Sequence, residues 1–256
     1  MILIDTHTHL YLDNYSDDQD IIIQKAIDQG VQKMLLPAID RSTFDSMLKL
    51  SNRYPENCLP MIGLHPTSVK DDYKEELALV EEQINKGGYI AIGEIGIDLY
   101  WDGTYFEQQK DAFRRQLRLA KKLGFPVAIH TRDSFDDIYK IVAEEKTDDL
   151  IGVFHCFTGS SAEAQKIMDL GFYMGIGGIL TFKNSGLADT VQDIPIEHLL
   201  LETDSPFLTP APHRGKRNES SYLTIIANKL AEVKGISFEE VGNITTNNAN
   251  QLFKLL

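Results

Sequence analysis

The chain has 256 residues, a hydrophobic fraction of 43% and a formal net charge of −13. No apolar run approaches the roughly 20 residues of a membrane-spanning helix, and the length suits one α/β barrel of about 250 residues. Such an acidic chain lacks the global positive field on which tight, sequence-indifferent nucleic-acid binding depends, so any nucleic-acid substrate must be held locally.

The N-terminus and the cysteines indicate the compartment. The first five residues lack the basic region and the cleavage site of a secretory signal, and they read as a strand. Cys58 and Cys156 are too few for a disulfide framework and lack zinc-knuckle spacing, and Cys156 is expected in the core. We therefore expect a reduced, cytoplasmic protein with no membrane association and no obligate protein partner.

Short apolar runs alternate with amphipathic segments along the whole chain, and no linker or composition break divides them. Near-continuous apolar runs are typical of parallel strands that helices cover. Eight such repeats predict an α/β fold, a TIM-type (β/α)8 barrel that residues 1–256 form as a single domain. The predicted strands are residues 2–5, 33–37, 59–64, 89–95, 126–130, 151–155, 172–176 and 199–204.

The segments between these strands carry helix signals. The clearest helix is 107–123, with Phe113, Leu117 and Ala120 on one stripe. Three further helix starts have the spacing of a capping box: Ser134 with Asp137, Ser160 with Glu163, and Ser237 with Glu240.

Histidines and acids recur where a predicted strand ends. Active residues of such barrels come from the C-terminal ends of strands and the loops that follow, so we expect these side chains on one rim. His198 precedes a strand and is expected at the opposite end, whereas His213 lies in the loop after the last strand. The residues of the expected rim are His7, His9, His65, Glu94, His130, His155 and Asp204.

These residue types indicate a metal site. Imidazole and carboxylate bind borderline and hard divalent cations, and both rings of a His-x-His segment face the same way. Six ligands exceed the three of an open catalytic zinc, so they predict two divalent ions, such as Mg, Mn or Zn. The predicted ligands are His7, His9 and Asp204 for one ion and His130 and His155 for the other, with Glu94 bridging them.

A two-metal site favours phosphodiester hydrolysis, because two ions lower the pKa of a shared water towards about 7 and stabilise the oxygens of a phosphoryl centre. Asp204 is expected to take the proton of that water, and with the bridging Glu94 it forms the predicted catalytic pair. Asp5, deeper on the first strand, is expected to orient His7, and Glu202 stands in the same relation to Asp204.

Seven segments resemble motifs of the TatD family of metal-dependent deoxyribonucleases, and together they extend over essentially the whole chain. The resemblance implies a TIM-type barrel of the amidohydrolase superfamily, the same six metal ligands, and 3′-to-5′ hydrolysis of DNA, single-stranded or at 3′ ends. The segments are DTHTHL at 5–10, GLHP at 63–66, GEIGID at 93–98, HTR at 130–132, HCFTG at 155–159, ETDSPFL at 202–208 and RGKRNE at 214–219.

A DNA substrate of this acidic chain has to be held near the metal site. Arginine offers bidentate contacts to phosphate, and aromatic rings stack on splayed bases. The predicted substrate contacts are His65, Arg132, Arg214, Lys216 and Trp101, with Tyr100 and Phe157 as further stacking surfaces.

Other functions stay open at this point. A metal-dependent amidohydrolase is one, although many binuclear members carry a carboxylated lysine on the fourth strand, which here ends in Glu94. A D-aminoacyl-tRNA deacylase is another, because the family resemblance also covers that activity. The third is a non-catalytic nucleic-acid-binding barrel, against which the complete ligand set argues.

Overall fold

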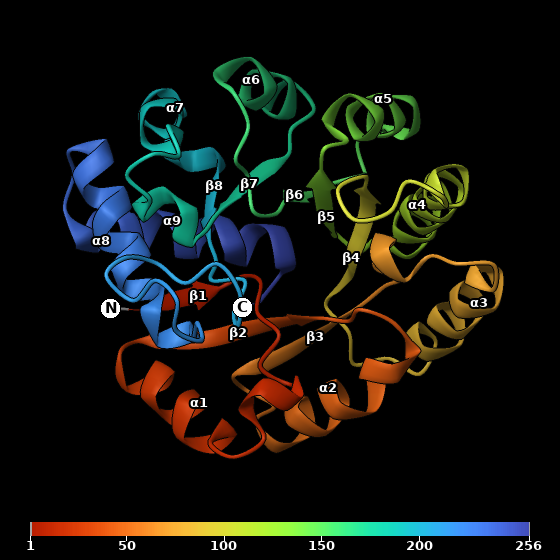
Figure 1. Ribbon diagram of the computed structural model, residues 1–256, viewed down its shortest axis with the longest axis horizontal. Helices are drawn as coiled ribbons and strands as arrows, with labels where there is room; N and C mark the ends of the chain where they lie inside the picture. Colours follow the sequence, from red (N-terminus) through yellow and green to blue (C-terminus); the bar gives the residue numbers. More distant parts are fainter. Residues whose placement is uncertain (1, 256) are drawn as a thin grey trace.

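The computed structural model describes residues 2–255, and within them eight parallel strands alternate with helices around a barrel (Figure 1). This confirms the predicted (β/α)8 fold. The strands are β1 (Leu3–Asp5), β2 (Val31–Pro37), β3 (Cys58–Ile62), β4 (Ala91–Asp98), β5 (Val127–Arg132), β6 (Gly152–Phe154), β7 (Tyr173–Ile176) and β8 (Leu199–Leu201).

Helices surround the strands, and each predicted repeat contributes at least one of them. Among the described residues, no helix combines the length and the apolar character that a membrane span requires. The helices are α1 (Gln19–Asp28), α2 (Arg41–Arg53), α3 (Tyr73–Ile84), α4 (Phe106–Leu123), α5 (Phe135–Glu145), α6 (Ser161–Asp169), α7 (Leu187–Asp193), α8 (Leu223–Lys234) and α9 (Phe238–Phe253).

The barrel is nearly closed between β8 and β1. Each strand from β1 to β8 pairs in parallel with the next in sequence. Just past β1, the amide of Thr6 donates to the carbonyl of Leu201 at 3.0 Å, and the amide of Asp204 donates to the carbonyl of His7 at 2.9 Å. These bonds bring the segments that follow the first and the last strand side by side at the C-terminal rim.

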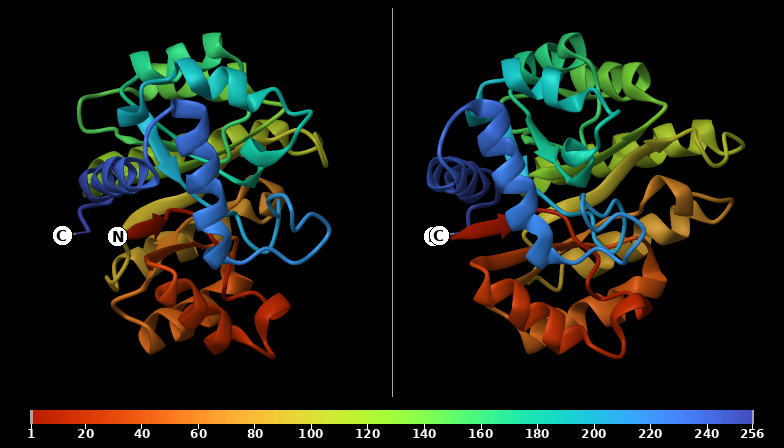
Figure 2. Two further views of the ribbon diagram at one scale, coloured as in Figure 1. Left: turned by 90° about the vertical axis from the view of Figure 1, so that its left-hand side faces the viewer. Right: turned by 60° about the vertical axis from the view of Figure 1, so that its left-hand side comes forward.

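The opposite end of the barrel is filled and covered. Alternate strand residues point inward and form one apolar cluster with side chains of α9. Figure 2 shows α9 on the side where the strands begin, while the loop after β8 projects from the other side. The inward cluster consists of Ile4, Leu35, Met61, Ala91, Ala128, Val153 and Leu200, with Ala249, Leu252 and Phe253 from α9.

Two strands extend beyond their predicted ends. β4 and β5 continue to pair past Gly96 and His130, so that Asp98 lies opposite Arg132. β6 and β8 are shorter than predicted, because the chain leaves the sheet before His155 and Asp204. The C-terminal rim is therefore uneven, with β4 and β5 rising above their neighbours.

The helix signals are largely confirmed. The predicted helix 107–123 corresponds to α4, and two of the three capping boxes form, at the starts of α6 and α9. The third is wrong. Ser134 precedes α5, but its hydroxyl donates to the carbonyl of Ile97 at 2.7 Å, so no box with Asp137 forms. This bond ties the start of α5 to the end of β4.

Candidate metal centre

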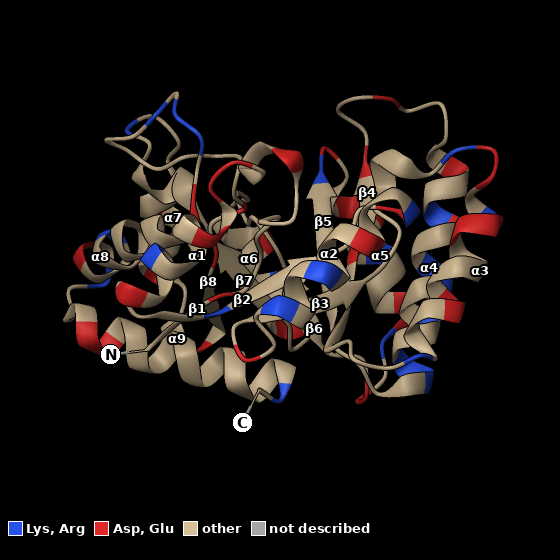
Figure 3. Ribbon diagram, turned by 90° about the horizontal axis from the view of Figure 1, so that it is seen from below, with Lys and Arg blue, Asp and Glu red and all other residues tan. Residues whose placement is uncertain are grey.

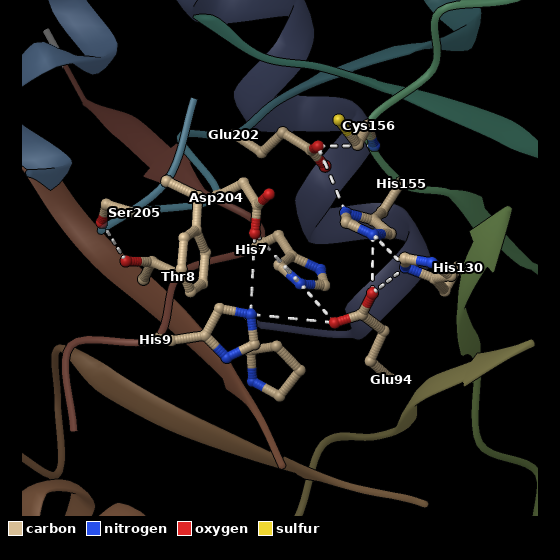
Figure 4. Close-up of polar contacts among 12 residues, drawn as sticks. His7, Thr8, His9, Glu94, His130, His155, Cys156, Glu202, Asp204 and Ser205 are labelled. Carbon is tan, nitrogen blue, oxygen red and sulfur yellow. Dashed lines mark hydrogen bonds and ion pairs between the residues drawn. The ribbon is translucent and has the colours of Figure 1, made fainter. Parts of the chain in front are cut away.

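A cavity of about 790 Å³ opens at the C-terminal end of the barrel, and the expected residues meet at its floor. His7 is fully buried beneath the others, which line the cavity. Figure 4 shows the side chains pointing toward one another from separate strands. The structure thus brings together His7, His9, Glu94, His130, His155 and Asp204.

Glu94 lies at the centre of this cluster. Its Oε2 is 3.0 Å from Nε2 of His7 and 3.7 Å from Nε2 of His9. Its Oε1 is 2.7 Å both from Nδ1 of His130 and from Nε2 of His155 (Figure 4). Because the two oxygens of one carboxylate face different histidine pairs, Glu94 has the geometry of a bridging ligand.

Asp204 completes the group around His7 and His9. Its Oδ1 is 3.9 Å from Nε2 of His7 and 3.6 Å from Nε2 of His9. Its side chain is 15% exposed, against 3% for that of Glu94, so Asp204 is the carboxylate that opens toward the cavity. Both His7 and His9 thus lie within 3.9 Å of Asp204, while the rings of His7 and His155 are stacked with centroids 3.8 Å apart, so the assignment of ligands to two separate ions stays a prediction.

Two further residues, Asp98 and Tyr11, hold imidazole rings of the cluster. Asp98 Oδ2 is 2.8 Å from Nε2 of His130, which leaves Nδ1 for the centre. The Tyr11 hydroxyl donates to the carbonyl of Pro37, so Nδ1–H of His9 donates to the Tyr11 oxygen and Nε2 keeps a lone pair. Carboxylates and similar acceptors behind a histidine fix its tautomer in metal sites.

Glu202 lies behind His155 at ion-pair distance, without a hydrogen bond to the ring. Its Oε1 is 3.4 Å from Nδ1 of His155 and accepts the amide of Cys156 at 2.6 Å. The other oxygen fits against Gly175 of β7, where a Cβ would lie only 2.0 Å away. The expectation that Glu202 supports Asp204 is therefore corrected: it supports His155.

Asp5 also differs from its expected role. Its carboxylate accepts the backbone amide of Thr203 at 2.9 Å and the Thr203 hydroxyl at 2.6 Å. It reaches His7 only at the backbone amide, at 3.5 Å, and not at the ring. Burial raises the pKa of Asp5 to about 7. Asp5 thus joins the end of β1 to the segment after β8 and does not orient the His7 ring.

Burial and charge compete in setting the pKa values of the cluster. Burial disfavours ionisation of Glu94, yet the neighbouring histidines, His155 first, hold its pKa well below the usual range. Burial also disfavours a protonated His155, but Glu94 and Glu202 raise its pKa well above the ordinary value. Burial, with His155 nearby, lowers the pKa of His7.

These donors fit divalent cations. Nitrogen and carboxylate oxygen atoms within 4.8 Å of one another form three overlapping sets, and none includes a thiol. Buried carboxylates that face several imidazole nitrogens need a positive charge between them, which protons or metal ions supply. The sets are His7, His9 and Glu94; His7, His155 and Asp204; and His65, Glu94 and His130.

The backbone around the cavity is strained. Among the described residues, five that are not glycine have a positive φ, and four of these line the cavity. A positive φ costs free energy in a residue that has a side chain. Such residues persist where the surrounding structure imposes the conformation, often at functional sites. The four are Asp133, Cys156, Asp204 and Leu208. Cys156 is half-buried at the cavity wall, so its expected place in the core was wrong.

The expected substrate contacts divide into two groups. His65, Trp101 and Arg132 line the cavity. Arg214 and Lys216 do not: both are exposed on the loop after β8, and the Arg214 guanidinium packs 3.6 Å from the centre of the Phe182 ring. Figure 3 shows this basic loop rising from the rim, opposite the loop after β4.

Two aromatic residues differ from what the sequence led us to expect. Phe157 is buried at 5% exposure and does not line the cavity, so its predicted stacking role is wrong. Phe207, for which no role was expected, is 51% exposed and lines the cavity. An aromatic residue three positions after Asp204 was a signal that could have been used.

Asp98 and Tyr11 were also missed. Asp98 lies four residues after Glu94 on the same strand, an even spacing that places both side chains on one face, but the predicted strand ended before Asp98. Tyr11 follows His9 by two residues in a turn, where no periodicity indicates its direction. Each supports a ring nitrogen of the cluster, and such partners are found only once the ring orientation is known.

A barrel with histidines and carboxylates gathered at the carboxyl ends of its strands belongs to the architecture in which metal-dependent hydrolases place their sites. A family model described as TatD related DNase matches residues 4–254. The chain therefore belongs to the TatD family, as its motifs indicated.

Similar proteins agree with this assignment. The chain is 40% identical over 255 residues to YabD of Bacillus subtilis, an uncharacterized metal-dependent hydrolase, covering 99% of this chain and 100% of that one. It is 36% identical over 261 residues to YcfH of Escherichia coli K12, which has the same description, covering 100% and 97%.

Solved structures extend the likeness to the fold. The crystal structure of YjjV, a TatD homolog from Escherichia coli K12, matches with a TM-score of 0.93 at 29% identity and 98% coverage of each chain. That of a TatD family hydrolase from Entamoeba histolytica matches with a TM-score of 0.87 at 26% identity, covering 100% and 99%.

Proposed function

We propose that this protein is a deoxyribonuclease that uses two divalent ions and water to hydrolyse phosphodiester bonds, removing nucleotides from the 3′ ends of single strands. The observation that supports it most is Glu94, whose two carboxylate oxygens face different histidine pairs. The family description, TatD related DNase, supports the choice of DNA. Because the cluster draws side chains from β1 to β8, we infer that residues 1–256 act as one domain.

The ions would be held by His7, His9 and Asp204 on one side of Glu94 and by His130 and His155 on the other. When bound, they supply positive charge that favours loss of a proton from water and offsets charge developing on a phosphate. Glu94 holds both groups at a fixed separation through its two oxygens.

Asp204 is the proton acceptor in this proposal. Burial acts against its ionisation, but contact with His9 and the charges of His155 and His7 lower the pKa of its carboxyl. It is therefore ionised at neutral pH and opens toward the cavity, as a general base must.

His65 and Arg132 would hold the phosphate. Nδ1 of His65 accepts the backbone amide of Thr67 at 3.2 Å, so the ring proton lies on Nε2, which points into the cavity 3.4 Å from Glu94 Oε1. His65 is thus a hydrogen-bond donor for a phosphate oxygen. Arg132 is the one Lys or Arg among the described residues that line the cavity.

A hydrolysis panel tests this function. Single-stranded DNA labelled at either end, RNA, a cyclic amide and a D-aminoacyl-tRNA are each incubated with Mg, Mn or Zn. The expected result is release of mononucleotides from the 3′ end of DNA, lost in His130→Ala and kept in His198→Ala. His198 lies beside β8 at the opposite end of the barrel and is the matched control. Hydrolysis of the amide or the ester with intact DNA would contradict the proposal.

A further inference from the structure

Exposed aromatic side chains stand at the cavity mouth. Six large hydrophobic side chains are exposed among the described residues, and three of them line this one cavity. Trp101 is 70% exposed, Tyr100 54% and Phe207 51%. Exposed apolar surface gathered at a polar site is typical of a ligand-binding surface.

Tyr100 and Trp101 form one platform, in the loop after β4. Their rings meet edge to face with centroids 4.9 Å apart, and the Arg132 guanidinium lies 3.9 Å from the centre of the Tyr100 ring. Asp98 Oδ1 accepts the amides of both residues at 3.0 and 3.4 Å, while its Oδ2 holds His130. One carboxylate therefore fixes this platform relative to the histidine at the metal centre.

Phe207 forms a second platform, in the segment after β8. Its ring centroid is 6.2 Å from that of His9, on the other side of Glu94 from His130. Its amide donates to the carbonyl of Asp204 at 2.9 Å, and its carbonyl accepts from the buried side-chain amide of Asn218 at 2.6 Å. The second platform is thus tied to the carboxylate that opens toward the cavity.

We propose that Phe207 and the Tyr100–Trp101 pair each stack on one base of the two nucleotides that flank the bond to be cleaved. This rests on the proposed function, because the phosphate is taken to sit at the metal centre between the platforms. A paired base must first unpair and unstack before it can lie on a protein ring, which costs free energy, so the favoured substrate class is a strand with two consecutive unpaired nucleotides at its end.

The charge of the protein supports this reading of the platforms. With a net charge of −13 and Arg132 as the one cavity-lining Lys or Arg among residues 2–255, Lys and Arg contacts in the cavity add little affinity beyond that for the phosphate at the metal centre. Stacking on aromatic rings needs no positive charge and accepts every base, because each base has a π-face.

Trp101 is the single tryptophan of the chain, so its fluorescence reports on the first platform directly. The probes are a single-stranded DNA 12-mer, the same strand with abasic positions at its last two nucleotides, and the blunt duplex. They are titrated into His130→Ala in the presence of the divalent ion and into the metal-free wild-type protein, neither of which is expected to cleave them. We expect quenching by the intact single strand, and at least tenfold weaker apparent binding of the abasic strand and the duplex.

Steady-state cleavage tests both platforms. Trp101→Ala and Phe207→Ala are each expected to lower kcat/KM for the intact strand by about tenfold, the worth of one stacked base. With a strand that lacks the base its platform would bind, each variant should have the same kcat/KM as the wild type. The missing base is the last one for one variant and the next-to-last one for the other. Trp101→Phe should recover most of the rate. Ile21→Ala, an exposed apolar residue away from the cavity, is the control.

The outcomes separate the two proposals. Equal quenching by the intact and abasic strands, or equal losses in both variants whichever base is missing, overturns the two-platform inference while nuclease activity stands. Base-dependent quenching without DNA hydrolysis under any divalent ion supports the platforms and overturns the proposed function.

Discussion

The two ends of the barrel are built from the same eight strands yet serve opposite purposes. At the N-terminal end, the inward side chains are apolar and α9 covers them. At the C-terminal end, the inward side chains are histidines and acids, and the chain leaves an open cavity. The difference shows that the two ends contribute separately to folding and to catalysis. Burial of apolar side chains at one end stabilises the fold and offsets the cost of placing ionisable groups close together at the other.

The largest expected effect comes from Glu94→Gln at the C-terminal end. Replacing the carboxylate that faces both histidine pairs should lower kcat/KM by about 10³-fold or more, because the negative charge that would hold both ions in the proposed site is lost. Denaturation with urea should show little loss of stability, since the cluster does not supply the apolar core. A variant that is unfolded without urea would contradict the claim that the N-terminal end supplies the stability and the C-terminal end the catalysis.

Leu200→Ala at the N-terminal end tests the converse. Leu200 is fully buried in the inward cluster, so its truncation should cost about 2–5 kcal/mol of unfolding free energy. Urea denaturation measures the loss, and metal content and kcat at low temperature should stay near those of the wild type. A matching loss of bound metal would show that the two ends are coupled.

Asp98→Asn sharpens the account of the C-terminal end. Asp98 touches His130 from behind, and loss of such a supporting carboxylate lowers metal affinity by about 10–100-fold. Calorimetric titration with Mn or Zn measures the change. Asp136→Asn on α5 removes a carboxylate whose side chain is exposed, and it should leave the affinity unchanged. Equal effects of the two substitutions would assign Asp98 no supporting role.

The smallest effect is expected outside both ends, in the helix layer. Hydrogen bonds from Arg118, opposed by partial burial and aided by Lys121, lower the pKa of Glu145 to about 2. A lowered folded-state pKa adds stability above the unfolded value near 4.5, and this stability disappears as the pH falls toward 2. Glu145→Gln should cost about 1–2 kcal/mol at pH 7 and nothing near pH 2. A pH-independent cost in urea titrations would contradict the pairing.

Much of this fold was readable from the sequence, because apolar strand runs repeat eight times and histidines follow their ends. The six clustered residues were found this way, since position at a strand end depends on local pattern and on the general form of the barrel. Glu94 was predicted to bridge two ions from the number of ligands at the strand ends and from its carboxylate at the end of the fourth strand, and in the structure its two oxygens face different histidines.

What the sequence did not predict depends on contacts between distant segments. Parity along β1 suggested that Asp5 faces His7, but the chain turns to pair with β8 and Asp5 meets Thr203 instead. The place of Arg214 depends on its packing against Phe182, from the loop after β7. No local pattern encodes such pairings.

The most direct test of the central claim is anomalous diffraction from crystals grown with Mn. The account predicts two peaks per chain, one on either side of the Glu94 carboxylate, with His7, His9 and Asp204 around one and His130 and His155 around the other. A single peak, or peaks outside the cavity, would contradict it.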